Sequence, residues 1–296
     1  MTLPFIPDPG LVPEVLPFFD PDTSTISYIV VEPGGTACAV IDPVLDFDPA
    51  SGRTGTDGAD AIIATIQRRG LVLTWLFETH VHADHLSAAR HIQSRLGGQI
   101  AIGRAITTVQ AVFGAVFGED SRFARDGSQF DRLLDDGDAV QIGAMTAHAL
   151  HTPGHTPACM TIVVGNAAFV GDTLFMPDGG TARADFPGGD ARQLYRSIHR
   201  VLSLPDQTRL FMCHDYAPGG RPVAWETTVA DERAHNIHVA DGVDEDTFVV
   251  LREARDASLG MPRLILPSLQ VNMRAGDFPP PDSEGRVFLK LPVNRL

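Results

Sequence analysis

Cysteine is scarce in this chain of 296 residues, which contains only Cys38, Cys159 and Cys213. Three cysteines are too few for a disulfide framework. We expect each to be a small buried apolar residue, with Cys213 turned by strand alternation to the face opposite the neighbouring His214. A chain without disulfides is typical of a reducing compartment, so the sequence predicts a cytoplasmic protein.

Long apolar runs are also missing. No segment approaches the roughly 20 consecutive apolar residues that span a bilayer. The N-terminus has no basic region and is interrupted by Pro4, Pro7 and Pro9, which argues against a signal peptide. The sequence therefore predicts neither membrane insertion nor export.

Positive charge is in short supply, because 23 Lys and Arg residues face 37 Asp and Glu residues, a net charge of −14. Nucleic-acid binding requires a basic face, so no nucleic-acid partner is expected. An anionic substrate would need a local cluster of basic side chains to overcome this field.

The length suits one large domain or a domain with an extension.

Apolar runs separated by turn residues predict alternating strands and helices. We expect the chain beyond Met261 to be extended because it is rich in proline, and we expect Asp84 to cap a helix. The alternation predicts a layered α/β fold with helices covering sheet faces. Strands are predicted at 25–31, 36–41, 72–77, 99–102, 139–142, 145–150, 160–164, 167–170 and 209–213, and helices at 59–69, 85–96, 106–117, 192–202, 223–238 and 244–257.

The densest polar cluster is residues 79–85, THVHADH, which places three imidazoles and a carboxylate directly after the apolar run 71–77. Imidazole and carboxylate are ligands that suit zinc and iron. Burying them together without a cation would be costly. The alternative is a polar surface loop, but further His and Asp residues recur in matching contexts downstream. The cluster therefore predicts a metal site at the end of a buried strand, where α/β sheets usually place their chemistry.

Three later segments repeat this arrangement. Each of them lies at the end of an apolar run and carries a potential ligand: 151–157 (HTPGHTP), 171–173 (GDT) and 213–216 (CHDY). We expect loops at one edge of the sheets to bring these side chains together.

In this order the motifs resemble the metallo-β-lactamase superfamily, whose HxHxDH pattern is followed by His, Asp and His; the resemblance covers most of residues 20–216. It implies a four-layer αβ/βα sandwich with a C-terminal helical and extended segment. The catalytic domain would be residues 1–222, with 223–296 packed on it as an extension rather than an independent domain. One ion would be held by His80, His82 and His155 and a second by Asp84, His85 and His214, with Asp172 between them.

Three stretches narrow the resemblance: 171–175, 180–190 and 266–276. They are similar to the persulfide dioxygenase branch, which includes the ethylmalonic encephalopathy protein and bacterial β-lactamase-like hydrolases. In that branch a single Fe(II) is implied, held by His80, His155 and Asp172. His82, Asp84, His85 and His214 would lie near the site and act as ligands only if it held two metals.

The implied activity is oxidation of glutathione persulfide, or a similar small thiol substrate, with O2 and water to give sulfite and glutathione. Two imidazoles and one carboxylate leave positions open on an iron ion, as in non-haem iron oxygenases. The alternative is a dinuclear zinc thioesterase of the glyoxalase II type, in which zinc activates water. Glyoxalase II carries a basic helical C-terminal domain, whereas the tail here is rich in proline. A metal-dependent sensor and an exported β-lactamase fit less well.

The resemblance also suggests substrate contacts. Arg183 corresponds to the basic residue near the glutathione tail, but it could instead form an ion pair with Asp185 or Asp190. Asp215 and Tyr216 would support the metal-bound imidazoles or face the substrate, with packing beneath the site as the alternative for Tyr216. Related enzymes suggest a homodimer. The remaining histidines lack motif context and are expected to hydrogen-bond at a strand end or to lie at the surface or at caps: His151, and His91, His148, His199, His235 and His238.

Overall fold

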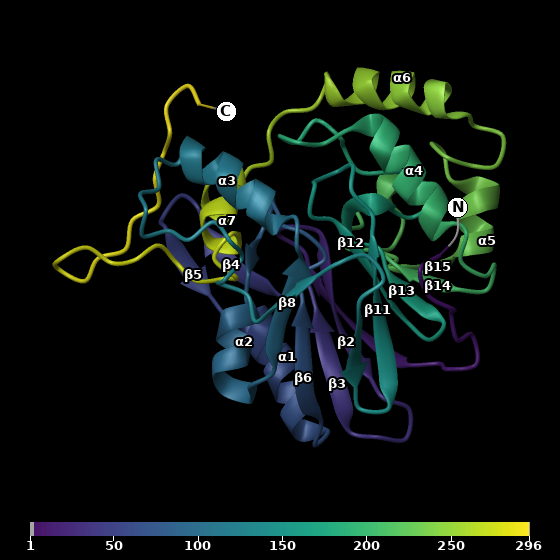
Figure 1. Ribbon diagram of the computed structural model, residues 1–296, viewed down its shortest axis with the longest axis horizontal. Coiled ribbons are helices and arrows are strands. Elements are labelled where there is room, and N and C mark those ends of the chain that lie inside the picture. Colours follow the sequence, from purple (N-terminus) through teal and green to yellow (C-terminus); the bar gives the residue numbers. More distant parts are fainter. Residues whose placement is uncertain (1–2, 296) are drawn as a thin grey trace.

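Two six-stranded sheets face each other in the computed structural model, which describes residues 3–295 (Figure 1). In the first sheet the pairs β3–β6, β6–β8 and β8–β9 are parallel, whereas β1–β2 and β2–β3 are antiparallel. Its strands, in spatial order, are β1 (Glu14–Asp20), β2 (Thr25–Val31), β3 (Ala37–Ile41), β6 (Val72–Phe77), β8 (Gln99–Gly103) and β9 (Arg132–Leu134).

The second sheet is antiparallel except for the parallel pair β13–β14. A small third sheet has the order β5 (Arg53–Gly55), β4 (Val44–Asp48) and β7 (Leu86–Ser87). The strands of the second sheet are, in spatial order, β10 (Ala139–Ile142), β11 (Met145–His151), β12 (Met160–Val164), β13 (Ala167–Phe169), β14 (Arg209–Phe211) and β15 (Glu226–Thr228).

Side-chain alternation divides the core into three apolar layers. On β2, Ile29 and Val31 join the cluster beneath one set of helices, while Tyr28 and Val30 join the cluster between the sheets. A third cluster lies beneath the helices of the second sheet. The helices on the first side are α1 (Asp57–Arg68), α2 (Ala89–Leu96), α3 (Ile106–Val116) and α7 (Ile265–Asn272), and those on the second are α4 (Ala191–Val201), α5 (Val229–His235) and α6 (Glu245–Asp256). The predicted four-layer αβ/βα sandwich is confirmed.

Three predicted elements differ from the structure. The helix expected at 85–96 begins at Ala89 with Ala88 as its N-cap, so Asp84 does not cap it. The helix expected at 223–238 is β15 followed by the short α5, which starts where the Thr228 hydroxyl accepts the Asp231 N–H.

The third difference is in the tail beyond Met261, which was expected to be extended but contains α7. Pro267 is tolerated there because it occupies the first turn, where a backbone N–H has no helical partner. Apolar burial then drives the helix, since Leu269 and Val271 are fully buried in the first core cluster.

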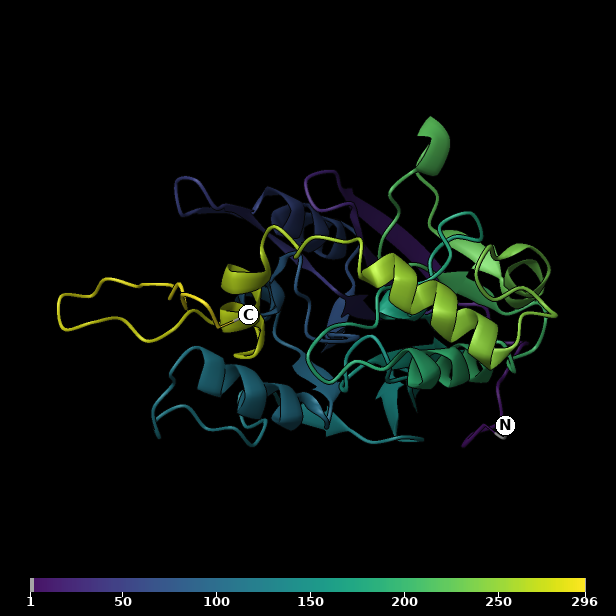
Figure 2. The same ribbon diagram turned by 90° about the horizontal axis from the view of Figure 1, so that it is seen from above.

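Past α7 the chain runs away from the body as an extended loop, which Figure 2 shows in yellow. Within residues 3–295, no helix combines the length and apolar character needed to cross a membrane.

Candidate metal centre

The first group of candidate ligands comes from three separate loops, which follow β6, β11 and β13. The ligand atoms of His80, His155 and Asp172 all lie within 4.8 Å of one another. Asp172 Oδ2 is 3.8 Å from His80 Nε2 and 3.6 Å from His155 Nε2. Two ligand atoms of one ion can be up to roughly 4.2 Å apart when each bond is near 2.1 Å, so both separations suit a shared ion.

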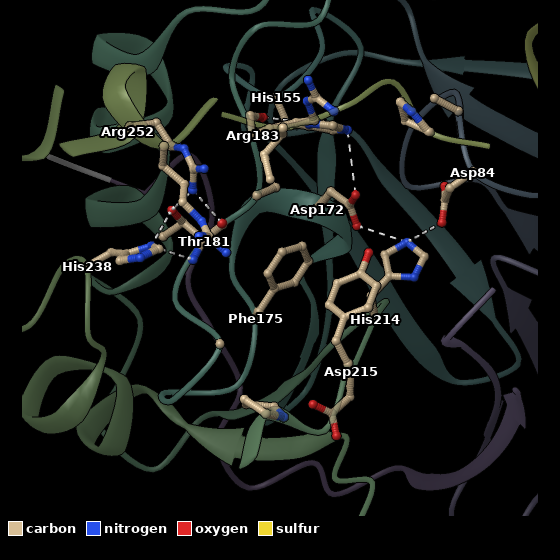
Figure 3. A pocket seen from close by; sticks show the side chains of 18 of the residues that line it. Asp84, His155, Asp172, Phe175, Thr181, Arg183, His214, Asp215, His238 and Arg252 are labelled. Atoms are coloured by element: carbon tan, nitrogen blue, oxygen red, sulfur yellow. Dashed lines mark hydrogen bonds and ion pairs between the residues drawn. The ribbon is translucent and has the colours of Figure 1, made fainter. Parts of the chain in front are cut away.

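The second group lies directly beside the first. The ligand atoms of His82, Asp84, His85 and His214 are also within 4.8 Å of one another. His214 Nε2 is 3.2 Å from Asp84 Oδ2 and 3.3 Å from Asp172 Oδ1. Asp172 therefore turns one oxygen to each group, as Figure 3 shows. All seven residues of the sequence motif meet at one edge of the sheets.

The donor atoms fit a metal because they are buried and most of them form no hydrogen bond within the described residues. Six of them form no hydrogen bond with any of residues 3–295. An unsatisfied buried polar atom costs about 1–3 kcal/mol, so six in one place would be strongly destabilising without a cation. They are His80 Nε2, His82 Nδ1, Asp84 Oδ2, His85 Nε2, Asp172 Oδ1 and His214 Nε2.

Hydrogen bonds on the opposite ring nitrogens orient these imidazoles. His155 Nδ1 donates to the Arg183 carbonyl oxygen at 2.8 Å, which leaves the Nε2 lone pair facing the site. His80 Nδ1 is 3.0 Å from the Thr79 hydroxyl. Both His85 Nδ1 and His214 Nδ1 face the hydroxyl of Thr25, at 3.4 and 3.3 Å. Such partners set which nitrogen is free to bind a metal.

Two buried carboxylates lie behind His82. Its Nε2 is 3.0 Å from Asp42 Oδ1 and 3.2 Å from Glu78 Oε2. Asp42 also accepts the Thr79 N–H at 2.7 Å and its hydroxyl at 2.8 Å. Burial raises the pKa of Glu78, whereas at Asp42 burial is outweighed by His82 and Thr79, which lower its pKa. The sequence reasoning missed both, although Asp42 directly follows the predicted strand 36–41.

A residue of the C-terminal helix α7 holds the backbone of the HxHxDH loop. Asn272 Nδ2 donates to the carbonyl oxygens of His82 and His85, each at 2.8 Å. Its Oδ1 accepts the Ser87 N–H at 2.8 Å. Asn272 is buried, and its amide satisfies three backbone groups of the loop. The only signal in the sequence was its position within the C-terminal stretch 266–276.

Two glycines allow the loops to approach closely. Gly171 has φ +53°, and a Cβ there would lie 2.6 Å from the Thr79 hydroxyl oxygen. Gly154 has φ +138°, and its Cβ would lie 2.3 Å from the Cα of Leu194. Both positions combine a backbone conformation that favours glycine with a contact that excludes a side chain.

The candidate ligands open into a cavity of about 1150 Å³. Phe175 and Tyr216 form an aromatic wall beside them, with the Tyr216 ring stacked on His214 at 5.9 Å between centroids. Tyr216 is 61% exposed, so it does not pack beneath the site. Asp215 is buried and accepts two hydrogen bonds from Arg221, at 2.6 and 2.8 Å. Its carboxylate therefore anchors the loop after His214.

Arg183 is held by internal partners. Its guanidinium forms a bidentate ion pair with Asp185, and Nη1 donates to the Gly260 carbonyl oxygen at 2.8 Å. Of the two acidic partners considered from the sequence, the structure has Asp185. The Asp190 side chain instead caps α4 by accepting the Gln193 N–H.

Cys213 is buried as predicted, but its direction differs from the prediction. Its sulfur lies within 4.8 Å of the ligand atoms of Asp172 and His214. Strand alternation does not apply because β14 ends at Phe211. Burial raises the pKa of the thiol well above its usual value, so the group is neutral.

One histidine without motif context also lies at the site. His238 lines the cavity, and its Nδ1 accepts the Thr181 N–H at 3.1 Å. It was expected at the surface or at a cap. His151 is hydrogen-bonded at a strand end as predicted, with Nε2 2.9 Å from the Pro157 carbonyl oxygen.

Comparison with known proteins places this geometry in context. A probable metallo-hydrolase of Burkholderia pseudomallei is 60% identical over 289 residues, covering 94% of this chain and 98% of that protein. Glyoxylase B2 of Dictyostelium discoideum is 42% identical, covering 93% and 95%. The mitochondrial persulfide dioxygenase ETHE1 of Bos taurus is 31% identical, covering 89% of each chain. The chain spans 65% of a β-lactamase hydrolase-like protein of Xylella fastidiosa that is 51% identical.

Among solved structures, ETHE1 from Myxococcus xanthus superposes with a TM-score of 0.71 at 29% identity, covering 90% of this chain and 100% of that one. The family model described as the metallo-beta-lactamase superfamily matches residues 21–214, from the turn after β1 to the last candidate ligand. The protein therefore belongs to the metallo-β-lactamase superfamily.

Proposed function

We propose that this protein is a mononuclear non-haem iron dioxygenase that oxidises glutathione persulfide with O2 and water to sulfite and glutathione. The observation that carries the proposal is the set of two imidazoles and one carboxylate, His80, His155 and Asp172, at the edge of a large cavity. Iron bound there would have open coordination positions and would supply the one-electron chemistry that the side chains lack. The relationship to persulfide dioxygenase ETHE1 supports the choice of substrate.

The surrounding residues orient the candidate ligands and shape the cavity for the substrate. Thr79 and the Arg183 carbonyl oxygen hold the rings of His80 and His155 with Nε2 toward the site. The exposed ring of Tyr216, together with Phe175, offers an aromatic surface to the sulfur end of the substrate. We propose a structural role for Arg183, because its guanidinium is already paired with Asp185.

The second candidate function is a dinuclear zinc hydrolase of the glyoxalase II type. It is favoured by the second complete group of ligands, His82, Asp84, His85 and His214. The names of two similar proteins, a probable metallo-hydrolase and a glyoxylase, point the same way. Imidazole and carboxylate suit iron and zinc alike, so the donor set alone does not choose between them.

Metal analysis after anaerobic purification distinguishes the two functions. About one iron per chain, with oxygen uptake on glutathione persulfide, is the expected result. Two zinc ions per chain with hydrolysis of S-lactoylglutathione and no oxygen uptake would replace the dioxygenase by the thioesterase. Reconstitution of the metal-free protein with Fe(II) or Zn(II) in separate samples guards against metal acquired during expression.

We further propose that residues 223–296 belong to the catalytic unit, since α6 lines the cavity and Asn272 of α7 holds the metal-site loop. The three cysteines are free and buried, which supports a reducing, cytoplasmic setting. A homodimer is proposed by analogy with related enzymes and is tested by light scattering.

A further inference from the structure

The cavity has two chemically different ends. One end carries the candidate metal ligands, with the carboxylates of Asp84 and Asp172. The opposite wall is formed by α6 and the segment that follows it. Figure 3 shows Arg252 and His238 on this side, away from Asp84 and His214.

Four arginines line the cavity, and two of them are neutralised within the protein. Arg183 is paired with Asp185. Arg252 is buried, and Nε and Nη2 donate to Asp256 Oδ1 at 2.9 and 2.6 Å, while Nη1 donates to the Thr181 carbonyl oxygen at 2.9 Å. Neither guanidinium is available to a ligand without breaking these bonds.

The other two arginines are Arg255, in the last turn of α6, and Arg263, in the segment before α7. Both are exposed, and within residues 3–295 neither side chain forms a hydrogen bond or an ion pair. Most arginines of the described residues pair with a carboxylate, as Arg183 and Arg252 do, and the net charge of the chain is −14. Two unpaired guanidinium groups therefore face one cavity in an otherwise acidic protein.

The pKa of His238 reflects the electrostatic field at this end of the cavity. Its pKa is lowered to about 4 by burial and by the positive charges of Arg252 and Arg255. The ring is neutral near pH 7 and adds no charge of its own. Burial, the larger cause, disfavours a charge of either sign, but the contribution of the two arginines shows a positive field at this end, and a positive field favours an anion.

We propose that Arg255 and Arg263 form an anion-binding subsite that takes the carboxylate groups at the non-reacting end of the thiol substrate. The inference rests on the proposed glutathione-derived substrate, but it holds for either metal chemistry. A planar guanidinium matches a carboxylate with two parallel hydrogen bonds. The cavity is slightly larger than ordinary small-molecule sites and has room for a peptide-sized thiol that reaches from one end to the other.

The test measures binding without turnover. The probe is S-methylglutathione, which has both carboxylates but no free thiol, titrated into metal-loaded protein by calorimetry. Its diethyl ester, which lacks the two negative charges, is the matched ligand. Arg255→Gln and Arg263→Gln remove the charges singly and together. Arg53→Gln is the control variant, since Arg53 is exposed on β5 and does not line the cavity.

Each single variant should weaken binding of S-methylglutathione roughly three- to ten-fold, and the double variant more. Binding of the diethyl ester should be weaker in the wild type and unaffected by the variants, and Arg53→Gln should behave as wild type. Equal binding of the acid and the ester by the wild type would overturn the subsite. So would a double variant that binds S-methylglutathione as tightly as the wild type, or one that loses both ligands equally.

Failure of the proposed function gives a different result. A protein that binds S-methylglutathione through these arginines but consumes no oxygen with glutathione persulfide keeps the subsite and loses the dioxygenase. As a kinetic companion, kcat/KM for glutathione persulfide should fall in the double variant, whereas kcat/KM for cysteamine persulfide, which has no carboxylate, should not change.

Discussion

Replacing Asn272 by Asp perturbs the metal-site loop from a distance with almost no change in shape. The remaining Oδ1 can still accept the Ser87 N–H. The second atom changes from an N–H donor to an oxygen that faces the carbonyl oxygens of His82 and His85, each 2.8 Å away. Two hydrogen bonds become two repulsive contacts inside the protein.

The magnitude follows from those two carbonyl groups. A buried acceptor that loses its donor costs about 1–3 kcal/mol, so the substitution should destabilise the folded protein by roughly 2–6 kcal/mol. If the loop moves to relieve the repulsion, the cost appears as lost metal affinity instead, and a change behind metal ligands typically weakens binding roughly 10- to 100-fold. Both effects share one cause, since the loop carries four candidate ligands.

Two measurements separate these outcomes. Calorimetric unfolding of the metal-free protein gives the stability loss, and competition with a chelator gives the metal affinity. Asn294→Asp, at an exposed position near the C-terminus, is the control for the added charge. If Asn272→Asp kept both the unfolding temperature and the metal affinity of the wild type, the assignment of α7 as the support of this loop would be refuted.

Three further outcomes are expected. Asp172→Ala should abolish metal retention and oxygen uptake while the fold persists by circular dichroism; full iron content in this variant would contradict the ligand assignment. Arg183→Ala should lower stability by about 1–2 kcal/mol through loss of its partly buried ion pair and leave KM for glutathione persulfide unchanged, whereas a raised KM would indicate substrate contact. Burial raises the pKa of Glu232 from 4.5 to about 8. The protonated side chain is therefore tolerated fully below pH 4.5, and the protein loses stability as the pH rises through 8 and the buried carboxyl ionises. Glu232→Gln should therefore stabilise the protein at pH 9 by up to roughly 5 kcal/mol and raise its unfolding temperature there, with little change at pH 5; equal increases at both pH values would indicate packing instead.

The ligand motifs could be found from the sequence because each is local. His80, Asp172 and His214 each follow an apolar run that is itself a recognisable strand. Continuous apolar character predicts a largely buried strand, which is why the predicted segment 72–77 coincides with β6, where Val72 is the exposed residue. Helix α7 was missed because two prolines nearby suggested an extended chain, while its apolar face pointed to burial. The prolines do favour an extended chain, but burial of the apolar residues of α7 in the first core cluster outweighed that preference.

The sequence by itself determined the donor types, their order and the alternation that turns one face of β2 toward each neighbouring layer. Only the tertiary structure decided which residues hold the metal-site loop in place. Asp42 is 40 residues before His82, and Asn272 is 190 residues after it, yet both hold the same loop. The hydrogen bonds from Arg252 to the Thr181 carbonyl oxygen and from Arg183 to the Gly260 carbonyl oxygen likewise join segments more than 70 residues apart. Such choices are made by burial, because a polar group removed from water must find whichever partner the fold brings within reach.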